Sequence, residues 1–297
     1  MKKVTIALLC LLPFLTFAET KRLDFEGAAA EVYKTASGDD LYIYIFSPEG
    51  HDPEKDRRAA AVFFFGGGWN SGTPAQFEQH ARFLASRGMV AAVADYRVKS
   101  RQQTGPKECV ADGKSAVRYL RKNAARLGID PAKIAAGGGS AGGHVATATA
   151  TLEKFDEPAE DKAISSAPDA LLLFNPVYDN GPEGGWAHSR VKEFWQDISP
   201  AHNIDAETPP AIVFLGEKDG LIPVATAERF QKKMEEAGVK SELHTYPGQP
   251  HGFFNEGKGG KEIFLDTLRK MDAFLVSIDF LEGAASDDQL EAVLKGK

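Results

Sequence analysis

A glycine-rich stretch in the middle of the chain, Gly137-Gly138-Gly139-Ser140-Ala141-Gly142-Gly143, limits what this sequence can fold into. The apolar residues 133–136 before it predict a short buried strand, and the small residues 144–150 after it predict a helix. A chain that passes from strand to helix over so few residues must turn sharply, and glycine accepts the backbone conformations that such a turn needs. The pattern Gly-x-Ser-x-Gly is typical of a strained turn that exposes a serine side chain. A flexible glycine-rich loop is the alternative, but the flanking strand and helix favour the sharp turn.

Short apolar runs alternate with helical patterns along the rest of the chain. Strands are predicted over residues 41–46, 60–65, 89–94, 133–137, 170–174, 211–215 and 242–246. Helices are predicted over residues 74–87, 107–127, 144–150, 225–237 and 261–280, and the polar residues 282–297 predict a peripheral helix or a loose tail. Continuous apolar runs are typical of strands buried on both faces. The alternation predicts an α/β fold with a mainly parallel central sheet and helices on both faces.

One long connection, residues 177–208, contains no strand pattern but several aromatic residues, including Trp186 and Trp195. Connections of this length are often lids or binding loops. We therefore expect a small cap segment or substrate loop, either packed on the body of the protein or placed to hold a sugar ring or a phenolic group.

The first 18 residues have the features of a signal peptide. Lys2 and Lys3 form a basic start, an apolar run follows, and Ala18 ends a cleavage site of small residues. The apolar run is shorter than the roughly 20 residues that a membrane-spanning helix needs. We expect a secreted or periplasmic protein whose mature chain, residues 19–297, forms a single domain.

The mature chain keeps one cysteine, Cys109, so no intramolecular disulfide is expected, and this side chain should be buried in a helix. The formal charge of the whole chain is −7, and removal of the signal peptide makes it more negative. An acidic balance argues against nucleic acid and anionic membranes as partners. A stable membrane association is not expected.

Ser140 has candidate partners further along the chain. A serine hydroxyl becomes a useful nucleophile when a base lies within hydrogen-bond reach and a third group orients that base. In folds of this type the order is serine, acid, histidine. Asp219, after the strand predicted over 211–215, is the candidate acid, with Glu217 as the alternative, and His251 is the candidate base. The other histidines fit less well; His80, for example, lies in a polar stretch of the sequence.

A second glycine run, Gly66-Gly67-Gly68-Trp69, follows the strand predicted over 60–65. Backbone N–H groups of Gly67 and Gly68, together with that of Ala141, are candidates for an oxyanion hole, which holds the negative charge of a tetrahedral intermediate. A plain turn is the alternative. We expect the three tryptophans Trp69, Trp186 and Trp195 to contact the substrate.

Together these motifs resemble the α/β-hydrolase superfamily, and within it the esterase/lipase branch that carries a His-Gly-Gly-Gly motif. The resemblance covers about residues 41–280 and rests on Gly138-x-Ser140-x-Gly142, Asp219, His251, Asp95-Tyr96-Arg97 and Gly66-Gly67-Gly68-Trp69. Phe65 stands where the family has its leading histidine. Since that residue supports the glycine loop in the family and donates no hydrogen bond, we expect the oxyanion hole to survive.

The resemblance implies a secreted serine carboxylesterase that forms an acyl-enzyme, similar to esterases acting on acetylated or feruloylated polysaccharides. The expected substrates are short acyl or feruloyl esters on carbohydrate, with no metal and no organic cofactor. A serine peptidase or formamidase of the same fold is one alternative. A non-catalytic binding protein on a hydrolase scaffold is another, although the intact set of Ser140, Asp219 and His251 argues against it.

Overall fold

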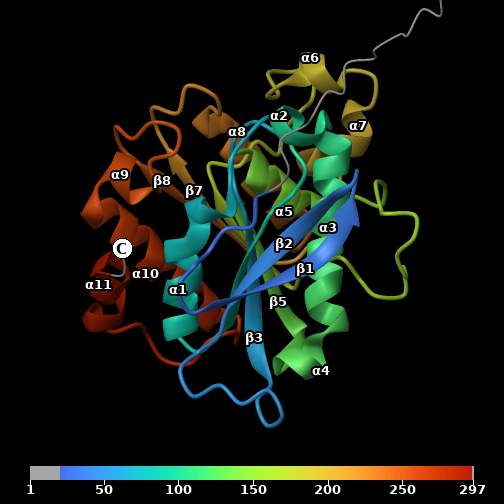
Figure 1. Ribbon diagram of the computed structural model, residues 1–297. Coiled ribbons are helices and arrows are strands. Elements are labelled where there is room, and N and C mark those ends of the chain that lie inside the picture. Colours follow the sequence, from blue (N-terminus) through green and yellow to red (C-terminus); the bar gives the residue numbers. More distant parts are fainter. Residues whose placement is uncertain (1–20, 296–297) are drawn as a thin grey trace, which may run out of the picture.

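The computed structural model describes residues 21–295 (Figure 1). The predicted signal peptide, residues 1–18, lies outside the described residues. Within them the chain forms one eight-stranded sheet with the strand order β1-β2-β4-β3-β5-β6-β7-β8. The strands are β1 (Ala28–Ala36), β2 (Asp39–Phe46), β3 (Arg58–Phe64), β4 (Val90–Ala94), β5 (Ile129–Gly139), β6 (Ala170–Phe174), β7 (Ala211–Gly216) and β8 (Ser241–Tyr246).

The sheet is mainly parallel, as predicted. The six strands from β4 to β8 in the sheet order run parallel to one another, while β2 pairs antiparallel with both β4 and β1. Strands β4, β6 and β7 are buried along their whole length, which explains their continuous apolar sequences. Parallel strands have their carboxyl ends at the same edge of the sheet. In folds of this type, ligands bind at this edge, in contact with the loops that follow the strands.

Helices cover both faces of the sheet (Figure 1). One hydrophobic core lies between the sheet and α3, α5 and α8, and a second lies between the sheet and α1, α10 and α11. The helices are α1 (Glu78–Ser86), α2 (Lys99–Gln102), α3 (Pro106–Lys122), α4 (Ala124–Leu127), α5 (Ala141–Thr151), α6 (His188–Val191), α7 (Trp195–Ile198), α8 (Val224–Glu236), α9 (Glu256–Gly259), α10 (Lys261–Ser277) and α11 (Asp287–Lys295), with the 3₁₀ turns η1 (Pro74–Phe77) and η2 (Pro200–His202). None of the helices between residues 21 and 295 combines the length and the apolar character needed to cross a lipid bilayer.

Several elements differ from the predictions. Strand β1 was not predicted. It is an edge strand in which only Tyr33 is buried, and its sequence, which begins with three alanines, shows no regular alternation of apolar and polar residues. The long helix predicted over 107–127 is divided at Asn123, whose side chain donates to the Tyr119 carbonyl oxygen. The tail predicted over 282–297 contains α11, which buries Leu290 and Val293 in the second core.

The 177–208 segment forms α6, α7 and η2, which lie beyond the carboxyl ends of the parallel strands (Figure 1). The segment is tied to the body of the protein from its first residue, because the Val177 N–H donates to the Ser140 carbonyl oxygen at 3.2 Å. Tyr178 is fully buried and stacks on Phe230 of α8, with ring centroids 4.2 Å apart. This segment therefore sits directly beside the turn that carries Ser140.

Candidate active site

Ser140 occupies the turn between β5 and α5, in a backbone conformation that few non-glycine residues adopt. Its φ and ψ angles are +54° and −118°. Such conformations cost about 1–3 kcal/mol and persist only where the surrounding structure holds them. The Ser140 N–H donates to the Phe174 carbonyl oxygen at the end of β6, at 2.9 Å. The strand-turn-helix context predicted from sequence is therefore present, and the turn is anchored to the neighbouring strand.

The glycines around Ser140 are required by close backbone contacts. A Cβ atom on Gly142 would lie 2.0 Å from the Phe64 carbonyl oxygen, and one on Gly138 would lie 2.5 Å from the Gly142 carbonyl carbon. Since real Cβ atoms do not approach backbone atoms so closely, only glycine fits at these two positions. The first turn of α5 can then pack directly against the end of β3.

The structure brings Ser140, His251 and Asp219 together. His251 Nε2 lies 2.9 Å from Ser140 Oγ, and His251 Nδ1 lies 2.7 Å from Asp219 Oδ2. The Asp219 side chain has no exposed surface, while that of His251 is 22% exposed. Both distances lie within the range for a nucleophile–base–acid arrangement. The imidazole is thus held on one side by the carboxylate and reaches the serine with its other nitrogen.

Asp219, and not the alternative Glu217, meets His251. The second oxygen of Asp219, Oδ1, accepts the backbone N–H groups of Leu221 and Ile222 at 2.8 and 3.0 Å. These bonds fix the carboxylate, so that Oδ2 points to His251. Glu217 is exposed and accepts a hydrogen bond from Thr245 Oγ1.

Asn175 supports the histidine loop and was not singled out from the sequence. This residue follows β6, is fully buried and has a φ of +35°. Its Oδ1 accepts the N–H of Gly252, the residue after His251, at 2.8 Å, and its own N–H donates to the Phe214 carbonyl oxygen at 2.7 Å. The sequence did offer a signal for Asn175: it is a polar residue directly after a buried strand and before a proline. A residue in that position lies at the carboxyl end of β6, beside the end of β5 that leads to Ser140.

The glycine loop after β3 borders Ser140. A Cβ on Gly66 would lie 3.3 Å from the Cβ of Ser140, and the Gly66 N–H donates to Gln76 Oε1 at 2.6 Å. Gly67 and Gly68 follow with φ angles of +133° and +65°. Ala141 is the first residue of α5, so its N–H has no acceptor within that helix. The candidate oxyanion donors Gly67, Gly68 and Ala141 therefore lie in segments that border Ser140, and their role stays a prediction.

Phe65 supports the glycine loop from the core of the protein. Its ring is buried and stacks on Tyr96, with ring centroids 4.1 Å apart, and the Tyr96 hydroxyl donates to the Phe65 carbonyl oxygen at 2.6 Å. Arg190 holds the other side, because one of its nitrogens donates to the Gly68 carbonyl oxygen at 2.9 Å. The loop backbone is thus fixed without a histidine at position 65.

The three tryptophans expected at the substrate have different positions. Trp69 is fully buried against the rings of His144 and Trp186, at centroid distances of 4.8 and 5.0 Å, so it anchors the glycine loop and presents no surface to a substrate. Trp186 is half-buried beside Gly68. Trp195 lines a separate pocket described below. The expectation of substrate contact is therefore not supported for Trp69, because the rings around it exclude solvent.

Two other histidines are buried in apolar surroundings. Burial lowers the pKa of His144 to about 4, and its Nε2 pairs with the Ile198 carbonyl oxygen at 2.8 Å. His80 was expected in a polar setting, but it lies among the rings of Phe63, Phe77, Phe174, Phe254 and Phe264, where burial lowers its pKa to about 3. Its sequence neighbours Glu78 and Gln79 face outward while His80 lies on the inner face of α1, three residues after the buried Phe77.

The described part of the chain, residues 21–295, has no group of three or more His, Cys, Asp or Glu side chains placed to hold a metal ion. Cys109 is buried at the start of α3, as expected.

Comparisons with known proteins agree with the fold. The profile of the alpha/beta hydrolase fold matches residues 61–255. Esterase 2 of Thermogutta terrifontis, in a structure phosphoramylated by tabun, is 46% identical with a TM-score of 0.84, and the alignment covers 88% of this chain and 98% of that one. The same esterase with propionate bound is 45% identical, with a TM-score of 0.83 and coverage of 88% and 97%.

Two curated relatives are longer proteins. Endo-1,4-beta-xylanase B of Butyrivibrio fibrisolvens is 26% identical over 235 residues, which are 72% of this chain and 36% of the relative. Acetylxylan esterase of Xylanibacter ruminicola is 27% identical over 215 residues, which are 68% of this chain and 42% of the relative. The chain therefore spans less than half the length of these two relatives.

Proposed function

The chain belongs to the α/β-hydrolase fold family, and we propose that it is a serine carboxylesterase that cleaves short acyl esters on carbohydrate through an acyl-enzyme. It is an ester hydrolase by its similarity, over nearly the whole of that relative's length, to esterase 2 of Thermogutta terrifontis. The single observation that carries the serine mechanism is the continuous contact from Asp219 through His251 to Ser140.

The geometry suits base-assisted attack by Ser140. His251 Nε2 accepts the proton of the Ser140 hydroxyl while the oxygen attacks the ester carbonyl carbon, and the buried Asp219 stabilises the imidazolium that forms. The negative charge on the carbonyl oxygen is held by the N–H groups of Gly67, Gly68 and Ala141. When the intermediate collapses, His251 gives its proton to the leaving alcohol, and the acyl group stays on Ser140.

Water completes the reaction at the same site. His251, neutral again, accepts a proton from a water molecule, which attacks the acyl carbonyl carbon. The second tetrahedral intermediate releases the carboxylic acid as Ser140 regains its proton from His251. Each step uses only Ser140, His251, Asp219 and backbone N–H groups.

The substrate part of the proposal rests on relatives. A structure of the esterase from Thermogutta terrifontis has propionate bound, and a more distant relative is an acetylxylan esterase. The bound propionate supports a small acyl group, and the acetylxylan esterase supports a carbohydrate alcohol. Export is part of the proposal as well, and an amino terminus at Glu19 in protein recovered outside the cytoplasm would support it.

A fluorophosphonate probe tests the mechanism directly. The folded protein should be labelled at Ser140. Ser140→Ala should not be labelled there, and a saturating short-chain nitrophenyl ester present during the reaction should slow the labelling of the wild type. Rates with p-nitrophenyl acetate, a longer nitrophenyl ester, a feruloyl ester and acetylated xylan would then order the substrates. Absence of labelling at Ser140 in folded protein would refute the serine-hydrolase mechanism.

A further inference from the structure

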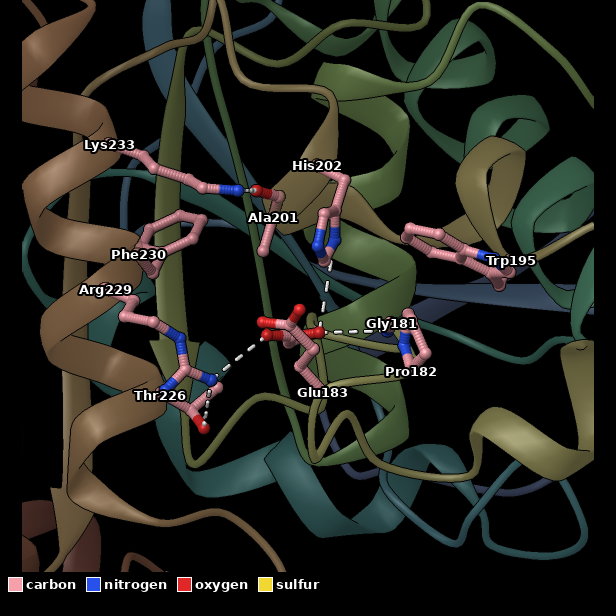
Figure 2. A pocket seen from close by; sticks show the side chains of 11 residues that line it. Gly181, Pro182, Glu183, Trp195, Ala201, His202, Thr226, Arg229, Phe230 and Lys233 are labelled. Atoms are coloured by element: carbon pink, nitrogen blue, oxygen red, sulfur yellow. Dashed lines mark hydrogen bonds and ion pairs between the residues drawn. The ribbon is translucent and has the colours of Figure 1, made fainter.

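A separate pocket lies between the 177–208 segment and α8 (Figure 2). Its volume is about 370 Å³, within the roughly 300–1,000 Å³ that is typical of small-molecule sites. Figure 2 shows Arg229, Phe230 and Lys233 of α8 on one side, Trp195 and Pro182 on the opposite side, and His202 between them. Neither Ser140 nor His251 lines it, so it is distinct from the site described above.

The charged groups of the pocket balance one another. Asp179 and Glu183 face Arg229 and Lys233, and the two acids and two bases cancel in formal charge. Arg229 lies 3.3 Å from Asp179, and Lys233 donates to the Ala201 carbonyl oxygen at 2.6 Å. Burial lowers the pKa of His202, which favours its neutral form. A balanced set of this kind favours a neutral ligand, because an anion or a cation would meet repulsion from half of it.

The same groups offer hydrogen bonds of both kinds. Arg229 and Lys233 carry more N–H donors than their present partners use, and the exposed carboxylate of Glu183 is an acceptor. Trp195 is half-buried, and its ring meets the rings of His202 and His188 edge to face at 5.0 and 6.1 Å, so its orientation is fixed by packing. A rigid aromatic ring beside donors and acceptors suits a ligand with apolar C–H faces and many hydroxyl groups.

The pocket is close to Ser140 along the chain and through hydrogen bonds. Val177 donates to the Ser140 carbonyl oxygen, and Asp179 follows after two residues, a step that spans at most about 7 Å. The loop of residues 179–186 is closed by two backbone bonds, from Gly185 to Gly181 and from Trp186 to Asp179. One part of this loop lines the pocket, while Trp186 at its end packs against Trp69 of the glycine loop.

From these observations we propose that this pocket binds a neutral glycosyl unit of the ester substrate, next to the unit whose ester reaches Ser140. The proposal rests on the esterase function proposed above and specifies its alcohol side. Trp195 and the α8 side chains would hold the sugar ring, and the 179–186 loop would link its position to the glycine loop.

Kinetics with two substrates separate the pocket from the catalytic site. We expect Trp195→Ala to lower kcat/KM for acetylated xylotetraose about tenfold, since an aromatic face is lost, with p-nitrophenyl acetate unchanged within twofold. Phe194→Ala is the matched control, because Phe194 is a neighbouring half-buried aromatic that packs on Lys107, 3.9 Å away, outside the pocket. Arg229→Met, which keeps the aliphatic stem, should also affect only the oligosaccharide.

Direct binding makes the test independent of turnover. Ser140→Ala should bind xylotetraose or cellotetraose in calorimetry, the additional change Trp195→Ala should weaken this binding about tenfold, and inorganic phosphate should not compete. If the wild type cleaves p-nitrophenyl acetate but Ser140→Ala binds neither oligosaccharide, the pocket proposal is wrong and the esterase proposal stands. Equal oligosaccharide kinetics for folded Trp195→Ala and wild type would also overturn it. Failure of the esterase proposal would show instead as absent labelling of Ser140.

Discussion

The contact between Asn175 and Gly252 offers a test of how the structure positions His251. Within residues 21–295, the Asn175 side chain forms no hydrogen bond with Ser140 or Asp219; its Oδ1 accepts the Gly252 N–H at 2.8 Å. Both residues are buried, so water does not replace this acceptor when it is removed. We therefore expect Asn175→Ala to shift the backbone that carries His251 and to lower kcat without changing KM.

The size of the effect follows from the lost hydrogen bond. A buried N–H left without an acceptor costs about 1–3 kcal/mol. If relaxation of the loop moves His251 and this energy appears in the transition state, kcat falls about 5- to 150-fold, since 1.36 kcal/mol corresponds to a factor of ten. Alanine at a φ of +35° adds strain of about 1 kcal/mol, whereas glycine does not. Asn175→Ala and Asn175→Gly should thus share one loss of kcat but differ in stability.

Steady-state kinetics with p-nitrophenyl acetate and urea unfolding measure the two effects separately. Asn255→Ala is the matched control, because Asn255 Nδ2 donates to the opposite side of the same residue, the Gly252 carbonyl oxygen, which keeps the Asn255 backbone N–H as a second donor. Its kcat should stay within about threefold of the wild type. A folded Asn175→Ala protein with kcat within twofold of the wild type would refute the positioning argument. So would kcat values that follow the stability difference between the alanine and glycine variants.

Two further predictions concern the acid partner and a buried histidine. In Asp219→Asn, the N–H groups of Leu221 and Ile222 require the amide oxygen, so the NH₂ group faces His251 Nδ1 and the ring proton moves to Nε2, where it prevents His251 from accepting the proton of Ser140. We expect kcat to fall about 10⁴-fold, while Glu217→Gln keeps nearly the kcat of the wild type. An Asp219→Asn protein with normal kcat would contradict the assignment of Asp219. His80 stays neutral in the folded state, with a pKa of about 3 against 6.5 in the unfolded chain, so stability is lost as pH falls below 6.5. Between pH 7 and pH 5, the free energy of unfolding measured in urea should fall by about 2 kcal/mol less for His80→Phe than for the wild type. Equal decreases for the two proteins would contradict this prediction.

Much of the fold, and the set of Ser140, His251 and Asp219, could be predicted from local sequence patterns and chain order. Strands β4, β6 and β7 are continuous apolar runs because both their faces are covered, and Ser140 is marked by glycines that the end of β3 requires. Asp219 and His251 were predictable because parallel strands bring their following loops to one edge. These residues carry signals that depend on sequence neighbours and chain order alone.

The remaining features depend on packing between segments that are distant in sequence. His80 has polar neighbours in the chain, but its five phenylalanine neighbours come from four other elements or loops as well as η1. Trp69 has the sequence context of a substrate-binding residue, but in the structure the rings of His144 and Trp186 cover it. Asn175 acquires its role only when Gly252, 77 positions later, returns to the end of β6.

The 177–208 segment joins the two parts of the proposal. Its first residues bond to Ser140, its 179–186 loop lines the second pocket, and Arg190 of α6 lies over the rings of Trp69 and Trp186 while bonding to Gly68. A ligand bound against the 179–186 loop would therefore also restrict the glycine loop beside Ser140, because Trp186 packs on Trp69. Arg190→Met removes the hydrogen bond to Gly68 but leaves the pocket beside α8 intact. It should therefore lower kcat equally for p-nitrophenyl acetate and for the acetylated oligosaccharide. Trp195→Ala should affect only the oligosaccharide, so the two variants distinguish support of the oxyanion loop from recognition of the sugar.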